Sequence, residues 1–275
     1  MKYCIDYRPN SRRIDEVDEI NVPFNKENMI TLLEYLKNHT SQRINIYIEN
    51  IDECLQYKII EKMINLKKEN PEINYALKFS MYNKDLPFDK MIKENIKFYF
   101  NIYISQWEDL LQMLDLGVSD IYITEDLGFE LNKVKKVCEN KVQIRAFPNI
   151  AQKSWDKLPD LKSFFIRPED VEKYEPYIDI LEIYGDRKKH DILFKIYSKN
   201  KQWFGKLNEI ITDFNSDLDS KFITPRFADK RIRCNRECLK GGKCMICEHI
   251  EELSKNLEEA KIIIRIDKKE EKENG

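Results

Sequence analysis

The sequence predicts an α/β fold, a single (β/α)8 barrel of the TIM type with a C-terminal cysteine-rich, metal-binding extension. Two observations predict it: short apolar segments alternate with longer amphipathic ones along residues 1–211, and four cysteines follow the last of these repeats. Alternating strands and helices indicate a parallel sheet with right-handed crossovers, and eight such units close most simply into a barrel. An open doubly wound sheet is the alternative, although the chain lacks the Gly-rich first turn usual in nucleotide-binding members of that class.

The expected strands are short runs rich in Ile, Tyr, Phe and Val, as buried parallel strands are. In chain order they are Tyr3–Tyr7, Ile44–Ile48, Tyr75–Phe79, Phe98–Ile104, Ile121–Thr124, Val142–Phe147, Ser163–Ile166 and Ile180–Tyr184. The repeat that fits least well contains Pro148–Leu161, because this segment has two prolines and no helical stripe.

Helices are expected between most of these strands. In Lys26–Asn38, for example, Met29, Leu32, Leu33 and Leu36 recur at helical spacing. The other expected helices are Ile51–Lys68, Phe88–Glu94, Trp107–Leu116, Leu131–Glu139, Glu169–Tyr177 and Lys188–Ile211.

The pattern changes after Ile211, which we take as the end of the barrel domain (residues 1–211). Residues 212–266 form the predicted extension, with the cysteines followed by a helix at Glu248–Leu257 and a strand at Lys261–Ile266. Residues 267–275 are nearly all charged and predict a disordered tail.

Composition narrows the class of protein. Charged residues make up 35% of the chain, above the usual level of about 25%, yet the formal net charge is only −2. A broad nucleic-acid surface is therefore not demanded. No run of about 18 apolar residues occurs, so neither a membrane span nor a secretory signal is expected. Seven cysteines, four of them clustered, suit metal binding in a reducing compartment, and we expect a cytoplasmic protein.

The cluster consists of Cys234, Cys238, Cys244 and Cys247, in the spacing Cys-x3-Cys-x5-Cys-x2-Cys. Gly241 and Gly242 lie between the second and third cysteine and permit the sharp turns that converging thiolates need. A structural zinc ion and a [4Fe–4S] cluster both take four thiolates, and the spacing does not separate them. The remaining cysteines, Cys4, Cys54 and Cys138, are expected to be small core residues.

Catalytic groups of a barrel belong at the carboxyl ends of its strands. The candidates for catalysis at these ends are Glu125, Asp126, Arg145, Arg167, Glu182 and Arg187. Other polar or aromatic residues expected at the mouth are Asp6, Arg8, Glu49, Asn50, Lys78, Asn101, Tyr103, Asn149 and Asp186. Arginine forks suit carboxylates and phosphates, which indicates an anionic metabolite or an RNA backbone as partner. Glu182, if it points inward, needs a partner such as Arg145.

Several of the candidates have a plain structural alternative. Arg167 precedes Pro168 and could orient a helix start, where Glu169 and Asp170 face the positive end of the helix dipole. Glu125 and Asp126 could cap a helix or lie in solvent. Motifs of serine hydrolases, zinc proteases and Walker loops are absent from the sequence.

Two stretches resemble the collagenase-like peptidase family, U32. Ile123–Gly128 is similar to its turn ending in Asp-Leu-Gly, and Phe165–Asp170 with Tyr174 and Ile178–Arg187 is similar to its Ile-Arg-Pro-Glu-Asp … Tyr … Asp … Gly-Arg stretch. The late cysteines followed by Ala260–Ile263 also resemble the ending of some members. The resemblance covers roughly residues 119–265.

The resemblance implies a barrel and a cysteine-bound cluster. The family's peptidase signature, Glu and Gly before a mid-chain pair of cysteines, is absent, and Asp186 separates the glycine and arginine of Gly-Arg. Other members assist oxygen-independent hydroxylation of tRNA or rRNA bases or of quinone precursors, using iron–sulfur clusters. The first expectation is thus an iron–sulfur enzyme or enzyme subunit acting on RNA or a small anionic metabolite, with a protein partner completing the site in some cases. The alternative is a non-catalytic binding or assembly protein with a structural zinc clip, and peptidase action is the third.

Overall fold

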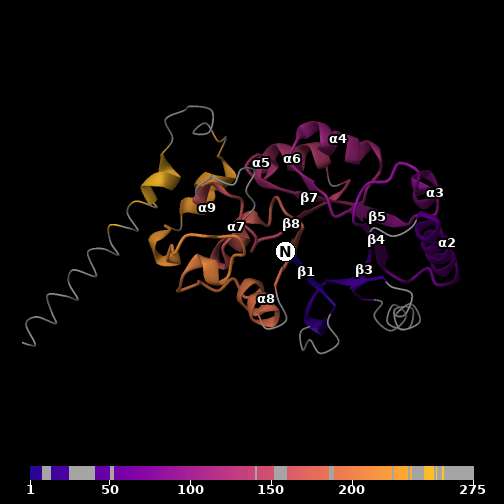
Figure 1. Cartoon of the computed structure of the whole chain (residues 1–275), viewed down its shortest axis with the longest axis horizontal. Coiled ribbons are helices and arrows are strands. Elements are labelled where there is room, and N and C mark those ends of the chain that lie inside the picture. The colour runs from indigo at the N-terminus through magenta and orange to yellow at the C-terminus, as the bar shows by residue number, and fades with distance from the viewer. Residues whose placement is uncertain are drawn as a thin grey trace, which may run out of the picture.

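Figure 1 shows the chain as a computed structural model. The structure describes residues 1–7, 14–24, 41–49, 53–139, 141–151, 160–185, 189–224, 226–234, 236, 245–250, 252 and 256. Of Glu53, Cys54, Glu125, Asp126 and Asp160, only the backbone belongs to this description.

One sheet organises the described part of the chain, and every pairing in it is parallel. Its strands are β1 (Lys2–Asp6), β2 (Glu19–Pro23), β3 (Arg43–Ile48), β4 (Tyr75–Phe79), β5 (Lys97–Phe100), β6 (Tyr103–Ile104), β7 (Asp120–Ile123), β8 (Gln143–Ala146) and β9 (Ile180–Glu182). Their order is β5-β4-β3-β2-β1-β9-β8-β7-β6, so the first and last strands are neighbours.

The two edge strands, β5 and β6, belong to one segment of chain, because only Asn101 and Ile102 separate them. The N–H of Ser119, next to β7, donates to the carbonyl of Phe98 in β5 over 2.8 Å. The sheet must therefore curl until its edges approach, and Figure 1 shows β1, β3, β4, β5, β7 and β8 following one another around a ring. The α/β class and the barrel-like curvature are as the sequence predicts, with nine strands in the described part of the chain rather than the eight expected.

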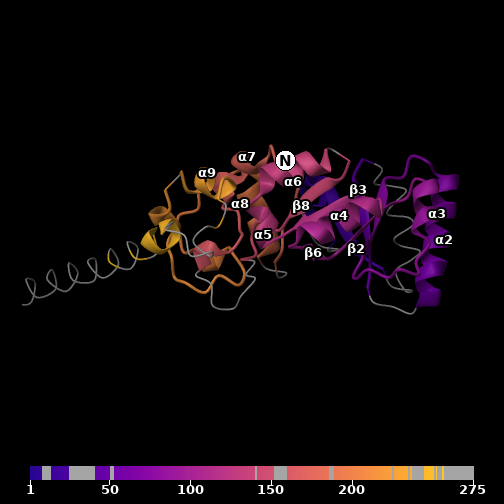
Figure 2. The same cartoon turned by 90° about the horizontal axis from the view of Figure 1, so that it is seen from above.

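Helices lie outside the ring of strands, as Figures 1 and 2 both show. They are α2 (Glu53–Glu69), α3 (Phe88–Lys93), α4 (Trp107–Asp115), α5 (Glu125–Gly128), α6 (Leu131–Cys138), α7 (Val171–Tyr174), α8 (His190–Ser198) and α9 (Arg226–Ile232). Short 3-10 turns occupy Ile14–Glu16, Asp160–Lys162, Pro168–Asp170, Leu207–Glu209 and Ser220–Phe222. No described helix is long and apolar enough to cross a membrane.

The two faces of the strands differ in chemistry because side chains alternate along a strand. The outward face is apolar: Leu77 and Phe79 of β4, and Ile121 and Ile123 of β7, are buried in the main hydrophobic core. Tyr75 also points outward, since its hydroxyl donates to the Met63 carbonyl of α2 over 2.6 Å. The residues between them, such as Lys78 and Tyr122, therefore point into the ring.

Several predicted elements differ from the structure. The predicted strand Ser163–Ile166 joins no strand of the sheet, and its buried apolar side chains instead pack in the core. Strand β2 was not predicted, because Glu19 and Asn21 interrupt its apolar pattern. The predicted helix Lys188–Ile211 ends at Ser198, after which Asn200 adopts a left-handed backbone with φ 47°.

Three further expectations lie outside the described residues: the helix Lys26–Asn38, the strand Lys261–Ile266 and the tail 267–275. The segment after Ile211 contributes Phe214, Leu218, Ile223 and Phe227 to the same hydrophobic core as the strands.

Candidate functional site

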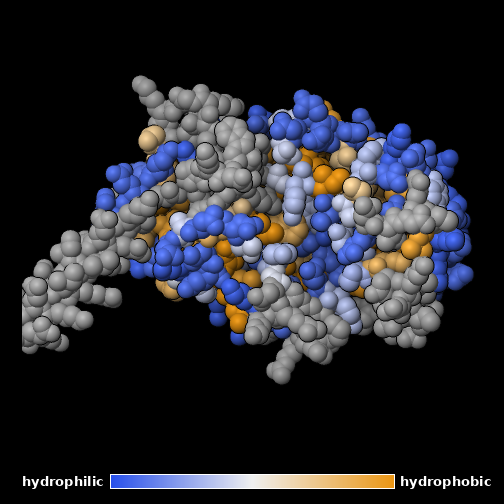
Figure 3. Space-filling model, viewed as in Figure 1, coloured by the Kyte–Doolittle hydropathy of each residue, from blue (hydrophilic) through white to orange (hydrophobic). Residues whose placement is uncertain are grey.

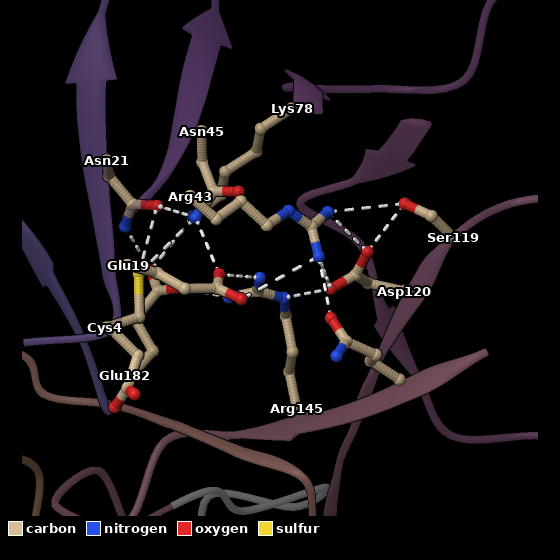
Figure 4. A network of polar contacts seen from close by, with 12 residues as sticks. Cys4, Glu19, Asn21, Arg43, Asn45, Lys78, Ser119, Asp120, Arg145 and Glu182 are labelled. Carbon is tan, nitrogen blue, oxygen red and sulfur yellow. Dashed lines mark hydrogen bonds and ion pairs between the residues drawn. The ribbon is translucent and has the colours of Figure 1, made fainter. Parts of the chain in front are cut away.

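A network of paired charges fills the interior of the ring toward the amino-terminal ends of the strands. It joins strands from opposite sides of the ring (Figure 4). The guanidinium of Arg43 on β3 lies 2.6 Å from Asp120 on β7, and Arg145 on β8 lies 2.8 Å from the other oxygen of Asp120. Arg145 also pairs with Glu19 on β2. These four side chains are at most 6% exposed. Because isolated buried charges are strongly unfavourable, each charge here depends on its partners.

The network fixes the ionisation of its carboxylates. Burial alone would raise the pKa of Asp120, but Arg43 and Arg145 outweigh it and lower that pKa to about 2. For Glu182 on β9, burial again opposes ionisation, and Lys78 and Arg145 outweigh it, so its pKa is lowered. Both carboxylates are therefore negatively charged at neutral pH.

Glu182, the last residue of β9, is the centre of the polar contacts toward the carboxyl ends of the strands. Its carboxylate accepts hydrogen bonds from Lys78 on β4 (2.8 Å), Asn21 on β2 (2.9 Å) and the Tyr122 hydroxyl on β7 (2.5 Å). The predicted partner Arg145 lies 3.6 Å away, farther than Lys78. These three hydrogen bonds fill most of the acceptor sites of the carboxylate.

Above Glu182 opens a cavity of about 350 Å3, at the carboxyl ends of the strands. This is where barrel proteins bind ligands, and the volume lies in the range of small-molecule sites. The lining consists mainly of aromatic and polar side chains: Asp6, Tyr7, Asn21, Pro23, Tyr47, Lys78, Asn101, Tyr103, Phe147, Glu182 and Tyr184. In Figure 3, hydrophilic residues dominate the surface over α2 to α4, whereas less hydrophilic residues gather toward the centre of that face.

Aromatic rings shape this cavity and hold its cation. The Lys78 ammonium lies 5.6 Å from the ring centroid of Tyr47 and 5.1 Å from that of Tyr122, within cation–π range. Phe147 stacks on Tyr122 at 5.2 Å and meets Tyr103 edge-on at 5.8 Å. The cation is thus rigidly placed between rings.

Among the described residues, the charges that line the cavity are one ammonium, Lys78, and two carboxylates, Asp6 and Glu182. Asn21 bridges the two acids, since its amide donates to Asp6 over 3.1 Å as well as to Glu182. Within the described chain Lys78 donates only to Glu182, which leaves two of its N–H groups for a ligand.

The predicted catalytic residues occupy different places. Glu182 lines the cavity, whereas Arg145 lies fully buried beneath it. Arg167 does not line it: its guanidinium bonds Asp170 (2.6 Å) and the Ile223 carbonyl (3.2 Å) on the outer side of the sheet. Glu125 and Asp126 begin α5 and their side chains are outside the description, as is all of Arg187. Arg8, Asn50 and Asp186, which were predicted at the mouth, also lie outside the described residues.

The predicted four-cysteine site is described only in part. Cys234 follows α9 and Cys247 lies in a helical segment at 246–250; both are half-buried against the core. The Cys247 thiol lies 3.5 Å from the Leu161 carbonyl. Cys238 and Cys244 are outside the described residues, among which no group of three metal-ligating side chains occurs. Cys4 and Cys138 are fully buried, as predicted.

The sequence analysis named Lys78, Arg145 and Glu182, but it missed Glu19, Arg43 and Asp120 of the charged network and most of the aromatic lining. The signal was present: Arg43, Lys78, Asp120 and Arg145 each stand in or beside an apolar strand segment, at positions that alternate with outward apolar residues. A charge in such a place needs an internal partner. Its partner lies far along the chain, so the pairing itself cannot be read from spacing.

The fold and the cavity define an α/β protein of barrel-like form with a small-molecule-sized site at the carboxyl ends of its strands. No protein-family model matches the chain, and no curated protein matches it either. A solved structure described as a U32 peptidase is similar to it, with a TM-score of 0.40 and 11% sequence identity over 68% of this chain and 94% of that chain.

Proposed function

We propose that the chain is a U32-like barrel protein, an enzyme or enzyme subunit, that binds a small polar molecule in the cavity above Glu182. The observation that carries this proposal is the Lys78 ammonium, fixed by Glu182 and two aromatic rings while two N–H donors remain open to the cavity. A ligand atom facing Lys78 must therefore be a hydrogen-bond acceptor, such as a carbonyl, hydroxyl or carboxylate oxygen.

The lining favours a small metabolite over an RNA backbone. Recognition of a polyanion needs several cations, whereas the described lining of this cavity offers Lys78 against the carboxylates of Asp6 and Glu182. A single carboxylate on the ligand is compatible with Lys78, which agrees with the small anionic metabolite expected from the sequence. The aromatic rings suit a planar or apolar part of the same molecule.

The residues suggest distinct roles. Lys78 stabilises negative charge on the ligand oxygen. Glu182, which accepts three hydrogen bonds and whose pKa is lowered, holds Lys78 rather than accepting a proton. Asp6 accepts a hydrogen bond from Asn21 alone within the described chain, so it is the candidate general base at the rim.

Titration with benzoate and benzamide, followed by NMR of the labelled protein, tests the site. Both probes combine an acceptor oxygen with a planar ring. We expect shifts for cavity residues in the wild type and their loss in Lys78→Met, whereas Lys90→Met, which removes a lysine of an exposed ion pair with Glu61, retains them. Circular dichroism verifies that each variant is folded. Equal responses in both variants, or shifts confined to other surfaces, would contradict the proposal.

We further propose that Cys234, Cys238, Cys244 and Cys247 hold a [4Fe–4S] cluster, with zinc as the alternative. Besides the spacing, Arg231 supports a thiolate centre: this buried guanidinium makes no ion pair with a described carboxylate. Burial lowers the pKa of Arg231, and Tyr174, Cys247, Cys234 and Asp170 lie near enough to act in the opposite direction. Thiolates at the two cysteines would add negative charge beside this guanidinium, so the residues fit such a group.

A bound cluster supplies electron transfer, as oxygen-independent hydroxylation needs, whereas zinc supplies a structural clip. Purification without oxygen, followed by metal analysis and an absorbance spectrum, distinguishes them. We expect iron and sulfide in the wild type and in Cys138→Ser, whose thiol is buried elsewhere, and their loss in Cys247→Ser. Stoichiometric zinc instead would favour the binding or assembly protein. Peptidase action, the third function, rests on the family resemblance alone.

A further inference from the structure

Arg231, in the last turn of α9, is a buried cation that no described carboxylate neutralises. The residue is 5% exposed, and within the described part of the chain it takes part in no ion pair. Asp170, the carboxylate near enough to interact with it, lies 2.6 Å from the Arg167 guanidinium and pairs there. Because a buried charge without a partner is strongly unfavourable, an anionic group is expected beside Arg231.

The position of the Arg231 guanidinium is fixed by backbone carbonyls and aromatic rings. Its two terminal nitrogens donate to the carbonyls of Phe165, over 3.3 Å, and Ser163. The ring centroids of Phe165, Phe227 and Phe129 lie 4.3, 5.2 and 5.3 Å from its central carbon. The buried Nε–H donates to no atom of the described chain. Carbonyls and rings orient the cation, but they bring no full negative charge to it.

The two described cysteines of the cluster are gathered at the same place. Both Cys234 and Cys247 lie close enough to Arg231 to interact with its charge. Cys234 follows α9, and its N–H donates to the Arg231 carbonyl over 3.0 Å. The Cys247 thiol lies 3.5 Å from the carbonyl of Leu161. The segment Leu161–Phe165 therefore contacts both Cys247 and the guanidinium, which places the cation and the two thiols against one stretch of backbone.

The backbone after Cys234 is arranged to receive negative charge on its sulfur. The N–H of Arg236 donates to the Cys234 sulfur over 3.4 Å, in a turn where Arg236 adopts a left-handed backbone with φ 53°. Such an N–H bonds a thiolate more strongly than a neutral thiol, because hydrogen bonds to charged acceptors are stronger. The Arg236 guanidinium lies 5.0 Å from the centroid of Phe129, the ring that also contacts Arg231. Two cations thus share one ring beside the segment that carries Cys234.

We infer that Arg231 is the counter-cation of the cysteine centre, a positioning residue whose charge strengthens metal binding by the thiolates of Cys234 and Cys247. A divalent metal ion with four thiolates retains a net negative charge, and so does a [4Fe–4S] cluster with four thiolates. A fixed, buried cation stabilises that charge more than it stabilises neutral thiols. This inference rests on the proposed four-cysteine centre and adds the residue that determines its affinity.

Titration of the full reduced chain with Co²⁺, without oxygen, tests the inference, because Co²⁺ bound by thiolates absorbs in the near ultraviolet. Arg231→Gln removes the charge, whereas Arg231→Lys retains it. Lys230→Met is the matched control, since Lys230 is an exposed cation in the same helix. We expect Arg231→Gln to weaken Co²⁺ binding about 10- to 100-fold, as the loss of an outer partner of a metal site does. Arg231→Lys and Lys230→Met should bind nearly as well as the wild type.

A second measurement uses the wild type alone, in case Arg231→Gln does not fold by circular dichroism. The Arg231 Nε–H resonance, assigned by its loss in Arg231→Lys, should shift and exchange more slowly with solvent when Zn²⁺ is added. An unchanged resonance would overturn the inference.

The outcomes separate this inference from the proposed centre. If the wild type binds Co²⁺ through Cys247 but Arg231→Gln binds it equally well, the centre stands and Arg231 is not its counter-cation. Equal weakening in Arg231→Gln and Arg231→Lys would also refute the inference, because loss of packing would then explain both. If neither Co²⁺ nor iron binds the wild type in a manner that depends on Cys247, the centre falls and the inference with it.

Discussion

Arg43 and Asp120 meet at 2.6 Å although four strands, β2, β1, β9 and β8, lie between their own strands in the sheet. Such a contact requires the sheet to curl until β3 faces β7. The same holds for Lys78 on β4 and Glu182 on β9, which are 2.8 Å apart. The curvature and the charged interior therefore depend on each other, because each pair across the ring forms only in the curled sheet. The pairs of Arg43 and Arg145 with Asp120 and Glu19 lie beneath the cavity and support its floor.

Replacing Asp120 by Asn should destabilise the protein by about 3–5 kcal/mol, because it leaves the buried guanidinium groups of Arg43 and Arg145 with too little negative charge. Urea unfolding measures the free energy. Glu139→Gln is the control: it removes an exposed carboxylate paired with Lys141 and should change stability by less than about 0.5 kcal/mol. Similar losses in both variants would show that the interior pairs are dispensable.

Stability should fall at acid pH through Asp120. Its pKa is about 2 in the folded chain, below the value of about 3.9 in an unfolded one, so the unfolded chain binds the proton first. The stabilisation is complete above about pH 5 and is lost as the pH falls toward 2. Glu182, whose pKa is also lowered, acts in the same direction. Urea midpoints from pH 6 to 2.5 should fall less steeply in Asp120→Asn than in the wild type; equal slopes would contradict this.

Two buried tyrosines inside the ring allow a matched comparison. The Tyr122 hydroxyl donates to Glu182, whereas the Tyr99 hydroxyl has no hydrogen-bond partner in the described chain. Tyr122→Phe should therefore cost about 1.5–3 kcal/mol, the usual loss for a hydrogen bond to a charged group, and Tyr99→Phe should be close to neutral or stabilising. Thermal and urea unfolding of both variants measure the difference. A larger loss for Tyr99→Phe would refute the assigned roles.

The sequence predicted those strands whose apolar residues alternate cleanly or run without interruption. Tyr75–Phe79 was predicted with the bounds that the structure has. Strand β2 was not, because inward-facing Glu19 and Asn21 make its pattern resemble a polar loop. The opposite error occurred at Ser163–Ile166, an apolar stretch that is buried without pairing in the sheet. In both cases tertiary contacts decided the structure, and local pattern cannot contain them.

The site was predictable to a similar degree. Strand ends indicated Asp6, Lys78, Asn101, Tyr103 and Glu182, all of which line the cavity. Which charges pair was not predictable, because the partners come from strands far apart in the chain. Arg145, predicted at the mouth, is one example, because it pairs with Glu19 and Asp120 below the cavity.

Arg167 should matter for stability rather than for ligand binding. Its guanidinium joins Asp170 (2.6 Å), Glu169 (3.2 Å) and the Ile223 carbonyl, and thereby ties the start of a 3-10 turn to the segment before α9. Arg167→Met breaks a buried pair and should lower the unfolding free energy by about 3–5 kcal/mol. At a temperature where the variant remains folded, benzoate should bind it as it binds the wild type. A selective loss of binding would instead place Arg167 in the site.

Asn149 should determine how firmly Tyr184 is held. In Asn149→Ala the Tyr184 N–H and carbonyl both lose their side-chain partner, whereas the backbone bond from Thr212 to residue 149 can persist. We expect the Tyr184 amide to exchange with deuterium about tenfold faster or more, as the loss of about 1.4 kcal/mol or more in local stability implies. Asn208→Ala, which removes an exposed hydrogen bond to Asp217, is the control and should leave that amide unchanged. Unchanged exchange at Tyr184 would mean that contacts other than those with the Asn149 side chain set its position.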